Sequence, residues 1–276
     1  MKVLIPMNEE TEKISRLVER SGNAFHFKVA NFFKQQRWHV LISPYYNDRN
    51  DDKIKEIDIV ATRFYLLADS WGEPLRERIC VRFFIECKYI NGPIAFWFGE
   101  KDKIKAEKLI VLNTPLKSSE ANQQIVGHHY YSEDRVVKLF STNINGEDII
   151  FKAVSQSLNS MLYYKQNGIQ ESTTDERKVW GNTLFIDYPL IVCNNFNRFY
   201  EVDTEEEGRY SKISGKNIQL ELNYAYHDVS GRAKNEYFLV DVVNFQEIEA
   251  FLSLLEREDI KVISEVREWE IQHRRS

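Results

Sequence analysis

Cysteine is scarce in this 276-residue chain, which has only three, and this argues against a disulfide framework or a structural zinc site. Cys80, Cys87 and Cys193 show no CxxC spacing, so we expect each to be a small apolar core residue. No apolar stretch approaches the ~20 residues of a membrane span, and the run at residues 3–7 is too short for a secretory signal. We therefore expect a cytoplasmic protein without a membrane partner.

An excess of positive charge is also lacking. The formal net charge of −5 gives no overall attraction to nucleic acid or to an anionic membrane. Hydrophobic residues at 43% and charged residues at 29% are typical of an ordinary globular protein. Nucleic-acid binding would therefore need a local basic surface, although ordinary solvated faces would use the same residues. The candidates for such a surface are Arg76, Arg78, Arg82, Lys101, Lys103, Lys105 and Lys108.

The sequence does contain a β-branched and aromatic stretch at residues 79–90, ICVRFFIECKYI, which predicts a strand. Side chains alternate along a strand, so Glu86 and Lys88 project from the same face near its end. The opposite face is apolar. Because buried charges are costly unless they are paired or bound to a metal, this acid and base call for an explanation.

A second predicted strand, residues 54–64 (IKEIDIVATRF), supplies one. If it pairs with residues 79–90 as a hairpin, Asp58 lies next to Glu86 and Lys88. Two carboxylates at short range repel each other, and a divalent cation between them relieves that repulsion. Oxygen ligands with a few retained waters suit Mg²⁺ or Mn²⁺.

The rest of the chain predicts alternating helices and strands. One long amphipathic helix is expected over residues 8–36, with Ile14, Val18, Phe25, Val29 and Phe32 as its buried stripe and with Glu19 and His26 on one edge. A second helix is expected over 147–167, its apolar side including Phe151. Short strands are predicted at 38–44, 183–193, 198–203 and 237–243, a further helix at 245–258, and polar loops at 47–55 and 205–216.

Two other groups of residues have side chains of metal-ligand type but lack the spacing of known metal sites. Asp48, Asp51 and Asp52 resemble calcium ligands, but the EF-hand spacing and glycine are absent. His128 and His129 are adjacent, so their side chains should diverge on a regular element. No third ligand stands at a characteristic zinc spacing from them.

The order helix, strand, Asp-bearing strand, ExK-bearing strand, helix, strand resembles the PD-(D/E)xK, or restriction-endonuclease-like, nuclease superfamily. The resemblance covers roughly residues 10–195 and rests on SGNAFHFKVANFF, EIDIVA, FFIECKY and SQSLNSMLYY. It implies an α/β fold with an α-β-β-β-α-β core and a mixed sheet flanked by helices. We expect a nuclease-like core at 1–203, with an insertion at about 94–145, and a C-terminal extension at 204–276 packed on the same domain.

Under this resemblance, Asp58 and Glu86 are metal ligands, assisted by the backbone carbonyl of Cys87. Lys88 orients the attacking water, and Gln156 on the following helix matches a polar residue near the site. Ile57 replaces the usual proline before the aspartate. His26 stands where many relatives have a glutamate; Glu19, two turns earlier, is a candidate substitute ligand.

The expected function is a Mg²⁺- or Mn²⁺-dependent nuclease, an endonuclease acting on DNA. RNA is an alternative substrate, and the features are compatible with a homodimer. A rival from another class is a catalytically inactive module with the same fold that binds nucleic acid or a protein partner. In that case Glu86 and Lys88 form a structural ion pair.

Overall fold

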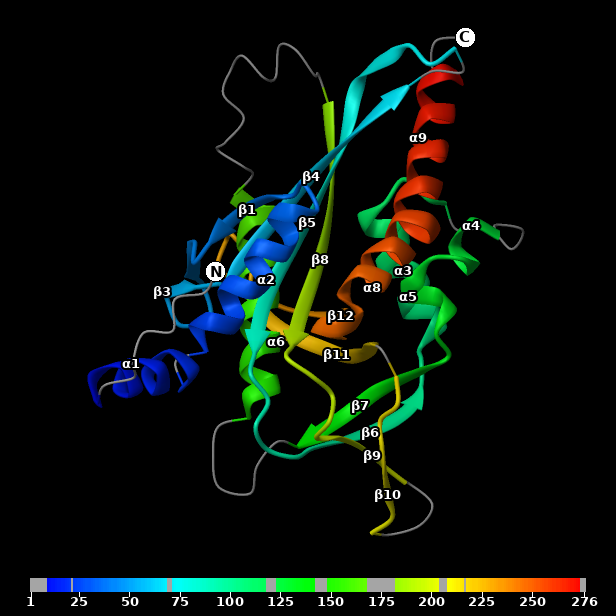
Figure 1. Cartoon of the computed structure of the whole chain (residues 1–276). Coiled ribbons are helices and arrows are strands. Elements are labelled where there is room, and N and C mark those ends of the chain that lie inside the picture. Colours follow the sequence, from blue (N-terminus) through cyan, green and yellow to red (C-terminus); the bar gives the residue numbers. More distant parts are fainter. Residues whose placement is uncertain are drawn as a thin grey trace.

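The computed structural model describes residues 9–20, 22–68, 71–117, 123–141, 148–167, 182–203, 208–215 and 217–273. These residues build an α/β protein whose large mixed sheet is flanked by helices (Figure 1). The first part of the sheet has the order β1-β4-β5-β8, in which β1 and β5 are antiparallel to β4, and β8 is parallel to β5. The bounds are β1 His39–Ile42, β4 Ile59–Ala68, β5 Pro74–Lys88 and β8 Asn182–Cys193.

The sheet continues from β8 through β12, β11, β7, β6 and β9 to β10. The strands that the predicted insertion and the predicted extension contribute therefore share a sheet with the core strands. The bounds are β6 Ile94–Glu100, β7 Arg135–Ser141, β9 Phe199–Val202, β10 Tyr210–Lys212, β11 Asn217–His227 and β12 Ala233–Asn244.

Helices cover both faces of the sheet because the central strands are apolar on both sides. In β5, Val81, Phe83 and Ile85 join one buried cluster, with α2, α3, α8 and α9, while Phe84 joins the other, with α6. Alternation along the strand thus places Glu86 and Lys88 on the α6 face. The bounds are α2 Asn23–Gln35, α3 Lys103–Asn113, α6 Ile149–Asn167, α8 Ile248–Leu255 and α9 Lys261–His273.

The single helix predicted over residues 8–36 is wrong. Two helices, α1 (Glu9–Arg20) and α2, are separated near Gly22, whose φ of 71° lies in the left-handed region that glycine adopts readily. Figure 1 shows α1 projecting away from the sheet, and the predicted core residues Ile14 and Val18 are 55% and 49% exposed. Only the α2 part of the stripe is packed against the sheet.

The polar loop predicted at residues 47–55 is also wrong, because β2 (Tyr45–Asp48) and β3 (Lys53–Glu56) form an antiparallel hairpin there. Asp48 is buried, and it accepts hydrogen bonds from Lys55 Nζ at 2.7 Å and Asn159 Nδ2 at 2.7 Å. Because Lys55 forms ion pairs with Asp48 and Asp51 within the segment, these charged residues can form a β-hairpin.

Further differences lie in the insertion, in the C-terminal extension and in the second predicted helix. The insertion forms β6, α3, α4 (Gln123–Val126), α5 (His129–Ser132) and β7. The predicted loop at 205–216 contains β10, β11 was not predicted, and Phe151 is exposed. The last helix continues from η1 (Phe245–Glu247) and α8 through the π-helical turn η2 (Glu256–Ile260) into α9. None of the described helices is long and apolar enough to span a membrane.

Candidate active site

Asp58 and Glu86 lie side by side where β4 begins and β5 ends. Ile59 pairs with Ile85 in the antiparallel ladder, so the next step of the register brings Asp58 level with Glu86. The Cys87 N–H donates to Asp58 Oδ2 at 2.7 Å, and the Asp58 N–H lies 3.4 Å from Glu86 Oε1. The predicted hairpin and its two neighbouring carboxylates are therefore present.

Lys88 completes this group, since its Nζ donates to Glu86 Oε2 at 2.6 Å. Burial of the Glu86 carboxyl raises its pKa to about 7; the Asp58 charge adds to this, and the Lys88 ammonium opposes it. Burial acts to lower the pKa of Lys88, but the Glu86 carboxylate outweighs burial and the net pKa is raised. A buried acid and a positively charged lysine thus share the end of β5.

His26 reaches the same place from α2. Its Nε2 is 2.6 Å from the backbone oxygen of Asp58, and its Nδ1 is 4.0 Å from Asp58 Oδ1. A carbonyl oxygen only accepts, so Nε2 carries a proton. His26 therefore holds the chain at Asp58 in place and presents its other ring nitrogen to the carboxylate.

The remaining predicted site residues are Gln156, Glu19 and Cys87. Gln156 Nε2 donates at 3.3 Å to the carbonyl of Glu56, two residues before Asp58, and makes no hydrogen bond to Asp58 or Glu86. Glu19 belongs to α1, and its side chain lies outside the described residues. Burial raises the pKa of the Cys87 thiol well above its usual value, so this thiol is uncharged and only its backbone takes part.

Tyr46 interacts electrostatically with Glu86, and the sequence did not reveal it, because no element was predicted between the strand at 38–44 and the loop at 47–55. Its hydroxyl is buried without a hydrogen-bond partner among the described residues, and so is Gln156 Oε1. Burial raises the pKa of Tyr46 strongly, and the charges of Asp48 and Glu86 add to the effect. These two polar atoms are available to water or to a bound group.

The donor set fits a hard divalent cation. The Asp58 side chain is 26% exposed, and its Oδ1 accepts no hydrogen bond from a described residue. Glu86 contributes a buried oxygen whose negative charge is opposed by burial, and a cation would favour that charge. Carboxylate and carbonyl oxygens with retained waters match the coordination of such ions.

The predicted basic surface is contradicted at two of its members. Arg82 is 2% exposed, and its guanidinium is bound by both carboxylate oxygens of Asp187, at 2.6 and 2.8 Å. Lys101 is also buried and donates to Gln219 and to the carbonyl of Tyr130. These two charges serve the interior of the protein and cannot contact nucleic acid.

The expectation that His128 and His129 diverge is wrong as well. Their rings stack 5.1 Å apart, and both lie near Asp259, which η2 supplies from 130 residues along the chain. Among the described residues, these three form the one group of His, Cys, Asp or Glu side chains whose spacing could hold a metal ion. Sequence spacing could not reveal a third ligand so distant in the chain.

Protons account for the contacts of His129, whereas the buried His128 Nε2 makes no hydrogen bond to a described residue. His128 Nδ1 accepts from the Tyr130 N–H, so the neutral ring carries its proton on Nε2, 3.4 Å from Asp259 Oδ2. His129 lies between Asp259 and Asp241, whose carboxylates outweigh the effect of burial and raise its pKa to about 9. A charged imidazolium lies between two carboxylates in this buried network.

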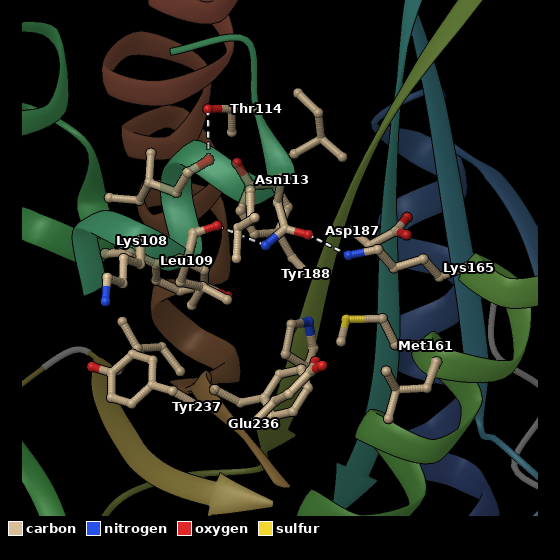
Figure 2. A pocket seen from close by; sticks show the side chains of 18 of the residues that line it. Lys108, Leu109, Asn113, Thr114, Met161, Lys165, Asp187, Tyr188, Glu236 and Tyr237 are labelled. Carbon is tan, nitrogen blue, oxygen red and sulfur yellow. Dashed lines mark hydrogen bonds between the residues drawn. The ribbon is translucent and has the colours of Figure 1, made fainter. Parts of the chain in front are cut away.

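Two cavities lie along an opening in the sheet. β12 pairs with β8 only over Asp241–Asn244 and Leu190–Cys193, and the two strands separate before these residues. A cavity of about 530 Å³ fills the fork, where Lys165 of α6 reaches across to Asn113 of α3 (Figure 2). A second cavity of about 680 Å³ continues along β8. Neither is lined by the carboxylates of the candidate site.

Comparison of this chain with protein-family models, with curated proteins and with solved structures finds no match.

Proposed function

We propose that this protein is a divalent-metal-dependent nuclease of the restriction-endonuclease-like type, an endonuclease that hydrolyses phosphodiester bonds in DNA. The observation that carries the proposal is the contact of Asp58, Glu86 and Lys88 at the adjoining ends of two antiparallel strands. The order of β1, β4, β5, α6 and β8 around them supports an α-β-β-β-α-β core. Mg²⁺ or Mn²⁺ is the proposed ion because the donors are oxygens.

Asp58, Glu86 and the Cys87 carbonyl would hold the ion, and a bound ion would supply the nucleophile at neutral pH by lowering the pKa of a water molecule. The Lys88 ammonium lies beside Glu86, a proposed ligand of the ion, and therefore next to the place of the scissile phosphate. There it stabilises the negative charge that builds on the phosphate. His26 keeps the Asp58 backbone in position through its Nε2–H. The partly exposed Asp58 side chain provides access for the phosphate.

The proposal is tested by incubating plasmid and linear DNA with the protein and Mg²⁺ or Mn²⁺. We expect nicking or linearisation of the plasmid, which an exonuclease would leave intact, and no cleavage with EDTA. A matching RNA substrate tests the alternative substrate. Absence of cleavage of either nucleic acid with both ions would contradict the proposed activity.

A non-catalytic binding module is the second candidate, and the burial of the Glu86–Lys88 pair favours it. Calorimetric titration with Mn²⁺ separates the two candidates. For the nuclease we expect one binding event that Asp58→Ala weakens at least 10-fold, because a ligand is lost. Asp51→Ala is the control, since Asp51 pairs with Lys53 and Lys55 on the nearby hairpin. Equal binding by wild type and Asp58→Ala would favour the module.

Burial of Glu86 also predicts how the stability of the metal-free protein depends on pH. Its folded pKa of about 7 is raised above the ordinary value of 4.5, so its contribution is fully present below about pH 4.5 and is lost up to pH 7. We expect the unfolding free energy of wild type, relative to Glu86→Gln, to fall by roughly 3 kcal/mol over this window. Urea unfolding in EDTA measures it, and a pH-independent difference would contradict the buried state of the carboxyl.

A further inference from the structure

The fork between β8 and β12 exposes the edge of a central strand. β8 pairs with β5 over Asn182–Cys193, whereas it pairs with β12 only over Leu190–Cys193. Every residue of β8 from 182 to 189 lines one of the two cavities. Because successive side chains of a strand point to opposite faces of the sheet, a space that all of these residues line must lie against the edge of β8. Backbone N–H and C=O groups at this edge form no ladder with β12 and are available to a ligand.

Pro189 stands where the fork begins, directly before Leu190. Proline has no backbone N–H, so it cannot donate a hydrogen bond to a neighbouring strand and is found at strand edges. Its position therefore favours an open edge of β8 over a continuous ladder with β12.

Lys165 of α6 and Asn113 of α3 meet in the fork, where the lysine ammonium donates to the asparagine side-chain oxygen (Figure 2). The two helices cover opposite faces of the sheet, so this contact passes through the opening. Both residues line both cavities. An extended peptide that paired with the edge of β8 would have to break the contact, whereas a small molecule in one cavity would not. The fork therefore favours a small ligand.

The cavity of about 530 Å³ has the size and the lining of a small-molecule site. Apolar side chains from α3, α6, β8 and β12 form much of its wall: Leu109, Ile110, Met161, Ile186, Phe238 and Leu239. Three tyrosines, Tyr188, Tyr226 and Tyr237, also line it. Burial of an apolar or aromatic body against these side chains is favourable.

Two acidic side chains line this cavity, and both are already engaged. The two carboxylate oxygens of Asp187 accept from the Arg82 guanidinium, at 2.6 and 2.8 Å. Burial raises the pKa of Tyr226, and the hydrogen bond of its hydroxyl to Glu236 adds to the effect. Neither carboxylate therefore calls for a cationic ligand.

Three lysines line the same cavity, and two of them lack a compensating charge. Lys105 pairs with Asp102 at 3.1 Å. Lys165 donates to the uncharged amide of Asn113, and neither Lys165 nor Lys108 has an ion pair with any described residue. These two ammonium groups favour a ligand that carries negative charge.

We propose that this cavity binds a small aromatic acid, whose ring fills the apolar part and whose carboxylate or phosphate group contacts Lys165. The edge of β8 offers backbone donors and acceptors to polar substituents of the ring. Asp58, Glu86 and Lys88 do not line the cavity, so the inference stands apart from the proposed nuclease function.

The test is calorimetric titration of the protein in EDTA with naphthoate, naphthyl phosphate and the uncharged naphthamide. We expect at least one of the two anions to bind at a single site, and the tighter of the two identifies the preferred acid group. Naphthamide should bind about 10-fold more weakly or worse, because it lacks the charge that contacts Lys165.

Lys165→Met keeps much of the apolar length of the side chain and should weaken anion binding by about 10-fold or more, leaving naphthamide unchanged. Lys212→Met is the matched control, since Lys212 is exposed on β10 at the far edge of the sheet. Leu109→Trp places a larger ring in the cavity from α3 and should weaken the binding of both anions. Thermal unfolding of each variant shows that it is folded.

Failure of both anions to bind at millimolar concentration would overturn the site. Equal affinity for naphthoate and naphthamide, or anion binding that Lys165→Met leaves unchanged, would overturn the anionic ligand. Anion binding at wild-type affinity by a folded Leu109→Trp variant would contradict the cavity as its place. Binding of an acidic peptide but of neither anion would assign the fork to an extended chain instead. None of these results depends on whether the protein cleaves DNA.

Discussion

Lys88→Ala is expected to reduce metal-dependent DNA cleavage by about 10²-fold or more while leaving the protein folded. The Lys88 ammonium lies 2.6 Å from Glu86 and beside the proposed scissile phosphate, where negative charge develops in the transition state. Its loss removes an interaction that strengthens as the bond breaks. The initial rate of plasmid nicking at saturating Mn²⁺ measures the effect, and saturation keeps metal occupancy from limiting the rate.

The control for this variant is Lys261→Ala, because Lys261 lies on α9 with its side chain 70% exposed and pairs only loosely with Glu265. It should cleave like wild type. Lys88→Ala also leaves Glu86 without its cation, so thermal unfolding with and without Mn²⁺ is compared in parallel. Undiminished cleavage by a folded Lys88→Ala variant would contradict the proposed role of Lys88 in stabilising the transition state, even if the metal binds.

The sequence was most informative where alternation and burial act together. The strand at residues 79–90 has β-branched and aromatic residues on both faces, so local pattern predicts the strand, and its pairing with the Asp58 segment, a condition at that point, is present in the structure. Those two strands also fix the distances among Asp58, Glu86 and Lys88. The central part of the candidate site could therefore be predicted from two short stretches of chain.

Features that depend on distant partners could not be predicted in this way. Asp48 is buried because Asn159 of α6 and Lys55 donate hydrogen bonds to its carboxylate. Asn159 lies more than 100 residues away in the sequence, so local pattern does not predict this contact. Arg82 looks like a surface cation until Asp187 of the neighbouring parallel strand is placed beside it. Charge in a sequence predicts exposure only on average, because a tertiary partner can make burial tolerable.

The buried histidine network shows the same principle with the largest expected effect on stability. Asp259 is fully buried and accepts from the His129 backbone N–H at 2.9 Å, from the His129 ring, and from the Tyr188 hydroxyl at 3.1 Å. Asp259→Asn removes one of the two carboxylates that compensate the His129 imidazolium, the other being Asp241, and leaves the His129 N–H and Tyr188 hydroxyl donors with a weaker acceptor. We expect a loss of about 3–5 kcal/mol in unfolding free energy at pH 6, measured by urea unfolding.

Glu258→Gln is the matched control at the neighbouring position. Glu258 is partly exposed and pairs with Arg257 at the surface, so its replacement should change stability by less than about 1 kcal/mol. If Asp259→Asn unfolds at the wild-type urea concentration, the network contributes nothing to folding. A metal ion in the cluster would instead show as a further loss of wild-type stability in EDTA.

The pH dependence identifies the charges that stabilise this network. The folded pKa of His129, about 9, is raised above 6.5, so its stabilisation is fully present below pH 6.5 and is lost as pH rises through 9. The pKa of Asp259 is lowered: burial would raise it, but the two histidines outweigh burial, so its contribution is lost only in acid. Burial lowers the pKa of His128 to about 4, and the Asp259 charge opposes this lowering, so the stability lost as pH falls below 6.5 is larger in the variant. We therefore expect the Asp259→Asn loss to be larger at pH 6 than at pH 10, where His129 is neutral in both proteins. A loss of equal size at both pH values would show that His129 does not carry a charge in the folded state.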